Sequence, residues 1–257
     1  MKLAVLISAK DGFPEGQIAS ACNLANVLDA PLTGIAVSDE HLRYYSAGGS
    51  LYNVVADTAA KMVDEQLGNL AARFRTVCDA AQVAHDWVGI HGIIEHHWPD
   101  ISPYFDLAIT AAPLSAPELA TCGITGTLQI ADDADIGTFD QRCVIAWDGS
   151  AEAGRALRTA LPLLPRFKDV EVIIIDPKSR SLSHDIGAYL GAHRISANIL
   201  REPSSGSTVA SLVLEEAEKA DLLVMGAYGS WKTLEKMFGG VTETMRRDCH
   251  KPVLFAN

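Results

Sequence analysis

Many apolar residues of this chain form short, uninterrupted runs. In the stretches between these runs, apolar residues recur with the period of a helix. The runs LTGIAVSD (32–39) and VEVIIIDP (170–177) are apolar almost throughout and end at an acidic residue. Such runs, without alternation, are typical of parallel strands covered on both faces. The stretch SAEAGRALRTALPLL instead opens on Ser150, a natural N-cap, and places Ala153 and Leu157 on one side of a helix. This alternation predicts an α/β fold with right-handed crossovers.

The same order of runs occurs twice along the chain. The first run, KLAVLISAKDG (2–12), resembles RCVIAWDGS (142–150), and each leads into a helical stretch. Later, YFDLAITAAP (104–113) matches KADLLVMGAY (219–228) closely. Short final runs, TLQIAD in the first copy and PVLFA in the second, are expected to close each sheet. This internal similarity predicts two copies of one structural unit.

A polar stretch, DDADIGTFDQ (132–141), marks the seam between the copies. We therefore predict two domains, over residues 1–135 and 141–257. The copies differ between their second and third strands: the first inserts a long helical segment over residues 51–81, where the second has only SLSHDIGAYLGAHR.

Charge narrows the classes of ligand that suit this chain. It carries 21 Lys and Arg against 32 Asp and Glu, a formal net charge of −11 at pH 7, which argues against a nucleic-acid partner. Residues 1–140 hold 6 basic and 18 acidic residues, a net of −12, and residues 141–257 hold 15 and 14, a net of +1. An anionic ligand is thus expected to be tolerated by the second copy and repelled by the first. The alternative is a mere drift of surface charge.

Neither a membrane nor an oxidising compartment is expected. No apolar run reaches the ~18 residues needed to cross a bilayer, and the first run ends at Asp11 and Gly12 instead of a cleavage site. The five cysteines are scattered and form no CxxC pair, so neither a disulfide framework nor a thiolate metal site is indicated. The sequence predicts a cytoplasmic protein.

Candidate chemistry lies where the strands of the second copy end, because ligands of open parallel sheets bind beyond the carboxyl ends of the strands. Small and polar residues fall there: Asp148, Gly149 and Ser150 after the first strand, and Gly226, Gly229, Gly239 and Gly240 after the fourth. Glycine lets the backbone approach a ligand with no Cβ in the way, and its N–H groups can converge on an anion. A helix starting near Gly240, with Thr242 in its first turn, adds the positive end of its dipole. We therefore predict a phosphate cradle; a tight strand-to-helix connection without a ligand is the alternative.

The spacing Gly-x2-Gly-x9-Gly after an apolar strand, together with DGS at 148–150, resembles the nucleotide-binding members of the universal stress protein family. The tandem repeat covers essentially the whole chain and resembles the two-domain members. The resemblance implies two doubly wound five-stranded parallel sheets of strand order 3-2-1-4-5, the adenine nucleotide alpha hydrolase-like fold. It also implies a stress-response regulator that binds ATP, accompanied by Mg²⁺, or a related adenine nucleotide.

The same resemblance assigns roles to residues of the second copy. Asp148, beside Gly149 and Ser150, would lie near the adenine and ribose, and backbone around Ile175 would contact the base. The glycines would line the ribose and triphosphate. The remaining implied site residues flank the cradle: Met225, Val241 and Thr242. From the residues alone, Asp148 could instead cap the helix that follows it.

Two features depart from the family pattern. Gly240 stands where the pattern has a hydroxyl or amide side chain, which removes one charge-assisted hydrogen bond, roughly 1.5–3 kcal/mol, and leaves the backbone donors. In the first copy no second glycine follows at spacing two, and Pro113 and Pro117, which donate no N–H, stand in the loop. Binding is therefore expected in residues 141–257 alone.

No catalytic residue and no metal site is predicted. His91 and Glu95 are the two ligands that one helical face would offer, and a third is missing. We find no general base beside the cradle, so ATP hydrolysis would be slow and incidental. The alternative function is a nucleotide-free interaction or chaperone-like scaffold in which both cradles have decayed. The family resemblance also implies that the two copies form an internal pseudo-dimer, and that two chains form a homodimer. Pairing through the final strands is expected because the edge strands of open sheets invite it. An unidentified protein partner is a further expectation.

Overall fold

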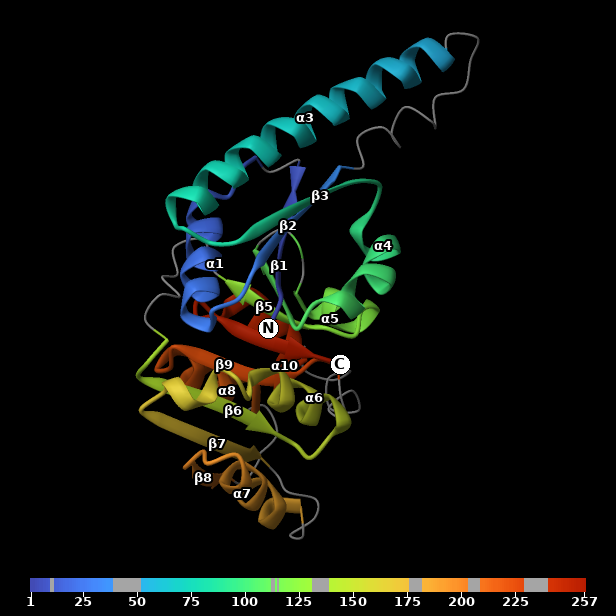
Figure 1. The fold of residues 1–257 in the computed structure, drawn as a ribbon. Coiled ribbons are helices and arrows are strands. Elements are labelled where there is room, and N and C mark those ends of the chain that lie inside the picture. Colours follow the sequence, from blue (N-terminus) through green and yellow to red (C-terminus); the bar gives the residue numbers. More distant parts are fainter. Residues whose placement is uncertain are drawn as a thin grey trace.

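The computed structural model describes residues 1–9, 12–38, 52–111, 114, 116–130, 139–175, 182–202, 209–228 and 240–257. Within them the chain forms one ten-stranded sheet with helices on both faces (Figure 1). The strands are β1 (Leu3–Ser8), β2 (Leu32–Ser38), β3 (His85–His91), β4 (Leu107–Ala111), β5 (Gly126–Ile130), β6 (Arg142–Trp147), β7 (Asp169–Ile175), β8 (Asn198–Glu202), β9 (Leu222–Gly226) and β10 (Val253–Ala256). The helices are α1 (Glu15–Leu28), α3 (Tyr52–Ala80), α4 (Ile94–Ile101), α5 (Ala116–Cys122), α6 (Ala151–Ala160), α7 (Leu182–Ala192), α8 (Val209–Glu218) and α10 (Val241–Asp248).

The strand order repeats the same pattern in both halves. The sheet runs β3-β2-β1-β4-β5-β10-β9-β6-β7-β8, so each half has the order 3-2-1-4-5. Neighbouring strands are parallel within each half, whereas β5 and β10 pair antiparallel, with Leu128 opposite Leu254. The predicted fold class and the pairing through the final strands are confirmed. Because β5 and β10 pair antiparallel, the strands of the two halves run in opposite directions. Their carboxyl ends therefore lie on opposite sides of the sheet, and the side where the strands of one half end is called the carboxyl edge of that half.

The helices cover the sheet in two layers. On one face α1, α3, α6 and α7 bury Leu24, Phe74 and Leu157 in an apolar core that spans both halves. On the other face α4 and α5 cover the first half around the fully buried Trp98, and α5, α8 and α10 cover the second. Helix α5 takes part in both clusters, through Leu119 in one and Ala116 in the other. Burial of apolar surface on both faces explains why the strands are apolar throughout.

The long helix predicted over residues 51–81 is α3. Among its residues with described side chains, those facing the core recur at helical spacing: Val63, Leu67, Leu70, Phe74 and Cys78. Figure 1 shows the amino-terminal part of α3 extending beyond the edge of the sheet. No helix in the described part of the chain is long and apolar enough to cross a membrane.

Two local predictions are wrong. His91 and Glu95 do not share a helical face: His91 is the last residue of β3, which pairs with β2 along its whole length, and α4 begins only at Ile94. The imidazole Nε2 of His91 lies 2.8 Å from the Asp64 carboxylate instead. Pro117 is not in a loop but in the first turn of α5, where a missing N–H costs no helical hydrogen bond. Pro113 and the predicted domain boundary after residue 135 lie outside the described residues.

Candidate functional site

The first group of predicted site residues lies where β6 ends and α6 begins. Ser150 is the N-cap of α6, as predicted, and its Oγ accepts a hydrogen bond from Ala153 N at 3.1 Å. One Asp148 carboxylate oxygen accepts from Ser150 N at 2.9 Å. Gly149 between them has φ +76°, a left-handed conformation that favours glycine. The DGS stretch thus builds a tight turn that starts α6 at the carboxyl edge of the second half.

Gly226, the last residue of β9, sits directly against this turn. A Cβ at Gly226 would lie 2.7 Å from Ala153 N and 2.9 Å from the carbonyl carbon of Glu152. These are backbone atoms of α6, so they cannot move aside cheaply. Glycine is therefore required here by the close approach of α6 to β9, whether or not a ligand binds.

The third component is the start of α10. Gly240 occupies the N-cap position with φ −58° and ψ 152°, and as a glycine it offers no side chain to cap the helix. The first-turn residues Val241 and Thr242 are 7% and 3% exposed. The Thr242 hydroxyl, which is expected to take part in ligand binding, accepts a hydrogen bond from Tyr228 N at 3.4 Å. That contact ties the start of α10 to the end of β9.

The structure thus brings some of the predicted site residues together. The turn at 148–150, Gly226 and residues 240–242 converge on one edge of the sheet, while Gly229 and Gly239 lie outside the described residues. Ile175 ends β7, next to β6, at the same edge. Met225 points the other way, into the buried cluster beneath α8 and α10.

Trp147 was not among the predicted site residues, although it directly precedes Asp148. Its indole N–H is buried and has no hydrogen-bond partner among the described residues. A buried donor without an acceptor is costly, commonly about 1–3 kcal/mol. The Trp147 ring packs against the core beneath α6 and α7, so only its adjacency to Asp148 in the chain relates this donor to the site.

Tyr228 was also missed, and it joins the two halves. It lies two residues beyond β9 with φ +53°, an uncommon conformation for a residue other than glycine. Its hydroxyl donates to Glu118 of α5 at 3.0 Å. Burial, together with the Glu118 carboxylate, raises the pKa of Tyr228 to about 12. A contact between residues 110 positions apart leaves no trace in the local pattern, so sequence analysis could not find it.

The charged groups of α10 pair with one another. Arg246 Nε and Nη2 lie 2.9 and 2.5 Å from the two carboxylate oxygens of Glu243, and this hydrogen-bonded pairing lowers the pKa of Glu243. The positive charge of Arg246 is thereby neutralised within its own helix. In the described part of the chain, no group of three or more His, Cys, Asp or Glu residues could hold a metal ion.

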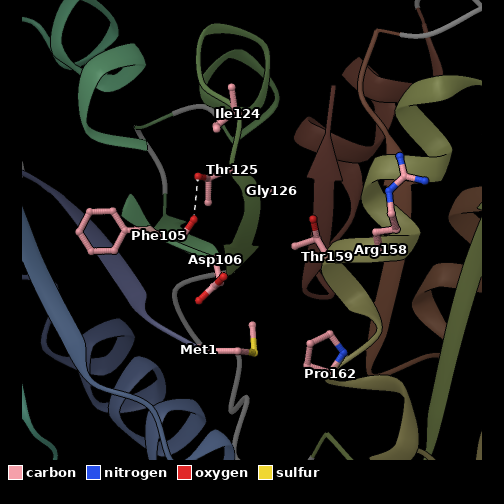
Figure 2. A pocket seen from close by; sticks show the side chains of 9 residues that line it. All are labelled: Met1, Phe105, Asp106, Ile124, Thr125, Gly126, Arg158, Thr159 and Pro162. Atoms are coloured by element: carbon pink, nitrogen blue, oxygen red, sulfur yellow. Dashed lines mark hydrogen bonds between the residues drawn. The ribbon is translucent and has the colours of Figure 1, made fainter. Parts of the chain in front are cut away.

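A cavity of about 290 Å³ lies elsewhere, between the two halves (Figure 2). Asp106, Thr125 and Gly126 line it from the first half, and Arg158 and Thr159 face them from α6. Much of its polar lining is already bonded: Asp106 accepts from Lys2 N at 2.7 Å, and both threonine hydroxyls donate to backbone carbonyls. None of the predicted site residues lines this cavity.

Comparison with known proteins rests on structure alone, because neither a protein-family model nor a curated protein sequence matches the chain. Among solved structures, a universal stress protein from Archaeoglobus fulgidus DSM 4304 superposes with a TM-score of 0.71, covering 99% of this chain and 98% of that one at 15% identity. The chain has the fold of the universal stress proteins. A functionally unknown protein from Pseudomonas aeruginosa PAO1 also matches, with a TM-score of 0.53 and 15% identity over 98% of this chain and 92% of that one.

At this identity the universal stress protein fold is shared, and the likeness says nothing further about ligands. A universal stress protein in complex with cAMP covers 46% of this chain with a TM-score of 0.34 and 18% identity, so its ligand is not transferred here.

Proposed function

We propose that this chain is a regulator of the universal stress protein type that binds an adenine nucleotide, ATP with Mg²⁺, at the carboxyl edge of its second half. The observation that carries the proposal is the uncapped start of α10. The helix begins at Val241, and Gly240 at its N-cap position has no side chain that could accept from the first-turn N–H groups. First-turn amides at a helix N-terminus, with the positive end of the dipole, suit a phosphate group.

A further feature supports a ligand at this edge. Gly149 turns the chain away from β6 through a left-handed conformation and has no side chain of its own at this point.

The residues at hand favour binding over turnover. The amides of α10 and the predicted glycines would hold the phosphates, and Mg²⁺ would be carried mainly by phosphate oxygens and water, as is usual for this ion. The Thr242 hydroxyl is bonded to Tyr228 N, and the Asp148 carboxylate accepts from Ser150 N. Neither is arranged as a general base for an attacking water, so hydrolysis would be incidental and occupancy would be what a protein partner detects.

A nucleotide-free scaffold is the second candidate, and a specific observation favours it. Gly226 is explained by packing, because its Cβ would meet the α6 backbone at 2.7 Å, and Thr242 is explained by its bond to Tyr228 N. Residues that resemble a nucleotide motif therefore have structural reasons of their own. If Gly229 and Gly239 have such reasons too, the second half binds nothing.

The test is the melting temperature of the full-length protein with and without Mg²⁺-ATP, AMP or cAMP. At about 100 times the Kd, binding should stabilise the protein by about 2.7 kcal/mol and raise the Tm by several degrees. Gly229→Val should abolish this response while the fold persists. The matched control is Gly191→Val on the exposed side of α7, where a Cβ would meet nothing within 4 Å; it should respond like the wild type.

A gain-of-function variant sharpens the test. Gly240→Ser restores the hydroxyl of the family pattern at the N-cap of α10 and should tighten ATP binding about tenfold or more. A Tm that stays constant with every nucleotide, together with no nucleotide released on denaturing the purified protein, would favour the scaffold.

A further inference from the structure

Two thiols meet in the core between α1 and α3. Cys22 and Cys78 are both 0% exposed, and their Sγ atoms lie 3.7 Å apart although the residues are 56 positions apart in the chain. A disulfide needs the sulfurs about 2.05 Å apart. To form a disulfide, the two sulfurs must therefore approach each other more closely than in this structure.

The other three cysteines contact no second thiol in the described part of the chain. Cys122 is half-buried and its Sγ donates to Leu119 O, and Cys249 donates to Lys251 O. Cys143 lies fully buried in β6. The three therefore serve as internal controls for any chemistry that depends on the pair.

The thiol pair is polarised. The hydrogen bond from Cys78 lowers the pKa of Cys22, while the same bond and burial raise the pKa of Cys78. Nucleophilic attack on an oxidant requires the thiolate, so Cys22 is the residue that reacts first.

We propose that Cys22 and Cys78 are an oxidation site, at which hydrogen peroxide converts the two thiols into a disulfide that fastens α1 to the last turn of α3. The Cys22 sulfur attacks one peroxide oxygen, the O–O bond breaks, and the departing hydroxide takes up the Cys22 proton as water. Cys22 is then a sulfenic acid. The Cys78 sulfur attacks the Cys22 sulfur, the S–O bond breaks, and the second water leaves with the Cys78 proton. Two thiols are oxidised and one peroxide is reduced to two waters.

Although Cys22 and Cys78 are buried, we expect a small oxidant to reach them when the end of α3 opens. Cys22 is followed by the exposed Asn23, and Cys78 by the exposed Asp79, so each cysteine has a neighbour in its own helix that reaches solvent. Cys78 lies in the last turn of α3, which ends at Ala80, and helix ends open more readily than helix centres. Hydrogen peroxide is small enough to enter through such an opening. Once Cys22 is oxidised, the neighbouring Cys78 should resolve it faster than any thiol in solution.

The experiment treats the full-length reduced protein with stoichiometric hydrogen peroxide and maps its peptides by mass spectrometry. The expected product is a Cys22–Cys78 cross-link that lacks two hydrogen atoms and is reversed by dithiothreitol. Because the bridge closes a loop of more than 50 residues in the unfolded chain, the oxidised form should melt roughly 5–10 °C higher than the reduced form.

Two kinds of cysteine variants distinguish the reaction of Cys22 and Cys78 from reactions of the other three cysteines. A variant with Cys122, Cys143 and Cys249 changed to alanine keeps the pair and should show the full cross-link and Tm shift. Cys22→Ala and Cys78→Ala should show neither, and in Cys78→Ala the Cys22 sulfenic acid should persist long enough to be trapped with dimedone. The proposal is overturned if both residues stay thiols under peroxide, become sulfinic acids separately, or cross-link only after urea unfolds the chain.

Discussion

At the scale of single residues, glycine is required at some positions of this chain by packing and not at others. Gly226 belongs to the predicted cradle, yet a Cβ there would collide with the α6 backbone at 2.7 Å. Gly68, on the exposed side of α3, would meet nothing within 4 Å. The sequence presents both simply as glycine, because the approach of a helix to a strand is a tertiary property.

These two glycines give a matched pair of variants. Gly226→Ala should lower the free energy of unfolding by about 1–3 kcal/mol, because the backbone of α6 must move. Gly68→Ala should raise it by about 0.5–1 kcal/mol, since alanine favours the helix. Urea denaturation measures both. A neutral Gly226→Ala would mean that α6 has room to shift and that the glycine is there for another reason.

The hydrogen bond between Tyr228 and Glu118 predicts a pH effect. In the folded state the pKa of Tyr228 is raised to about 12 from an ordinary value near 10, so the folded protein holds this proton more tightly than the unfolded chain. Its contribution is fully present below about pH 10 and is lost as the pH rises toward 12. Tyr228→Phe should therefore cost about 1 kcal/mol at pH 8. The gap to the wild type should narrow steadily above pH 10.

Denaturation curves between pH 8 and pH 11 measure that gap. Tyr104→Phe is the control, since Tyr104 is 73% exposed; this variant should match the wild type at every pH. A Tyr228→Phe gap of the same size at every pH would contradict a pKa of Tyr228 that is raised in the folded state.

At the scale of elements, an ion cluster joins β6, β7 and α8. Arg142 Nη2 lies 2.9 Å from Glu171 Oε1 and 2.6 Å from Glu216 Oε2, and Lys219 Nζ lies 2.8 Å from the other Glu216 oxygen. The hydrogen bonds from Lys219 and Arg142 lower the pKa of Glu216. The cluster fixes α8 over the amino ends of the strands, on the edge away from the proposed site.

Glu216→Gln should destabilise the protein by about 1–2 kcal/mol at pH 7, because a half-buried charge partner of Arg142 is removed. Since the folded pKa of Glu216 is lowered, its contribution is present above the unfolded value near 4.5 and is lost as the pH falls through the folded pKa. The difference from the wild type should therefore close on acidification. Glu215→Gln, which removes only an exposed pairing with Lys219, should stay within about 0.5 kcal/mol. Equal effects of the two variants would contradict the role of Arg142.

Most elements could be predicted from the sequence, because strands buried on both faces must be apolar throughout and helices must show an apolar stripe. The helix over 51–81 and the N-cap at Ser150 followed from these rules alone. The strand order came from the family resemblance, since nothing local encodes it. His91 was placed on a helix because its neighbours are helical, whereas pairing with β2 extends β3 up to it. In the candidate site, the turn at 148–150 could be predicted from the sequence. Tyr228 and Trp147 could not, because their significance depends on tertiary contacts and burial that arise only in the folded chain.

At the scale of the whole molecule, the two halves are held together by more than the β5–β10 pairing. A Cβ at Gly126 of β5 would lie 2.7 Å from Thr159 Cγ2 of α6, so the halves interlock across the join. Gln129 Nε2 also donates to Arg246 O at 3.1 Å. We expect the chain to unfold as one cooperative unit.

A double-mutant cycle tests this interlock. Gly126→Ala should cost about 1–3 kcal/mol, because threonine is branched at Cβ and cannot turn aside easily. In the Thr159→Ala background the clashing atoms are gone, and the same glycine change should cost less by at least 0.5 kcal/mol. Calorimetry should show one transition for the wild type. Strictly additive changes would mean that the two residues do not touch in solution.

The antiparallel join of β5 and β10 also limits how copies of this chain can associate. The last strand of each half, β5 or β10, pairs with the other inside the same molecule. The backbone hydrogen bonds through which two single-domain chains could join their sheets are therefore already made within this chain. Among the described strands, only β3 and β8 keep an open side, and they stand at opposite ends of the sheet. Pairing between described strands of two copies is therefore limited to these two ends, and the strand sides that couple the halves are not available to a second chain.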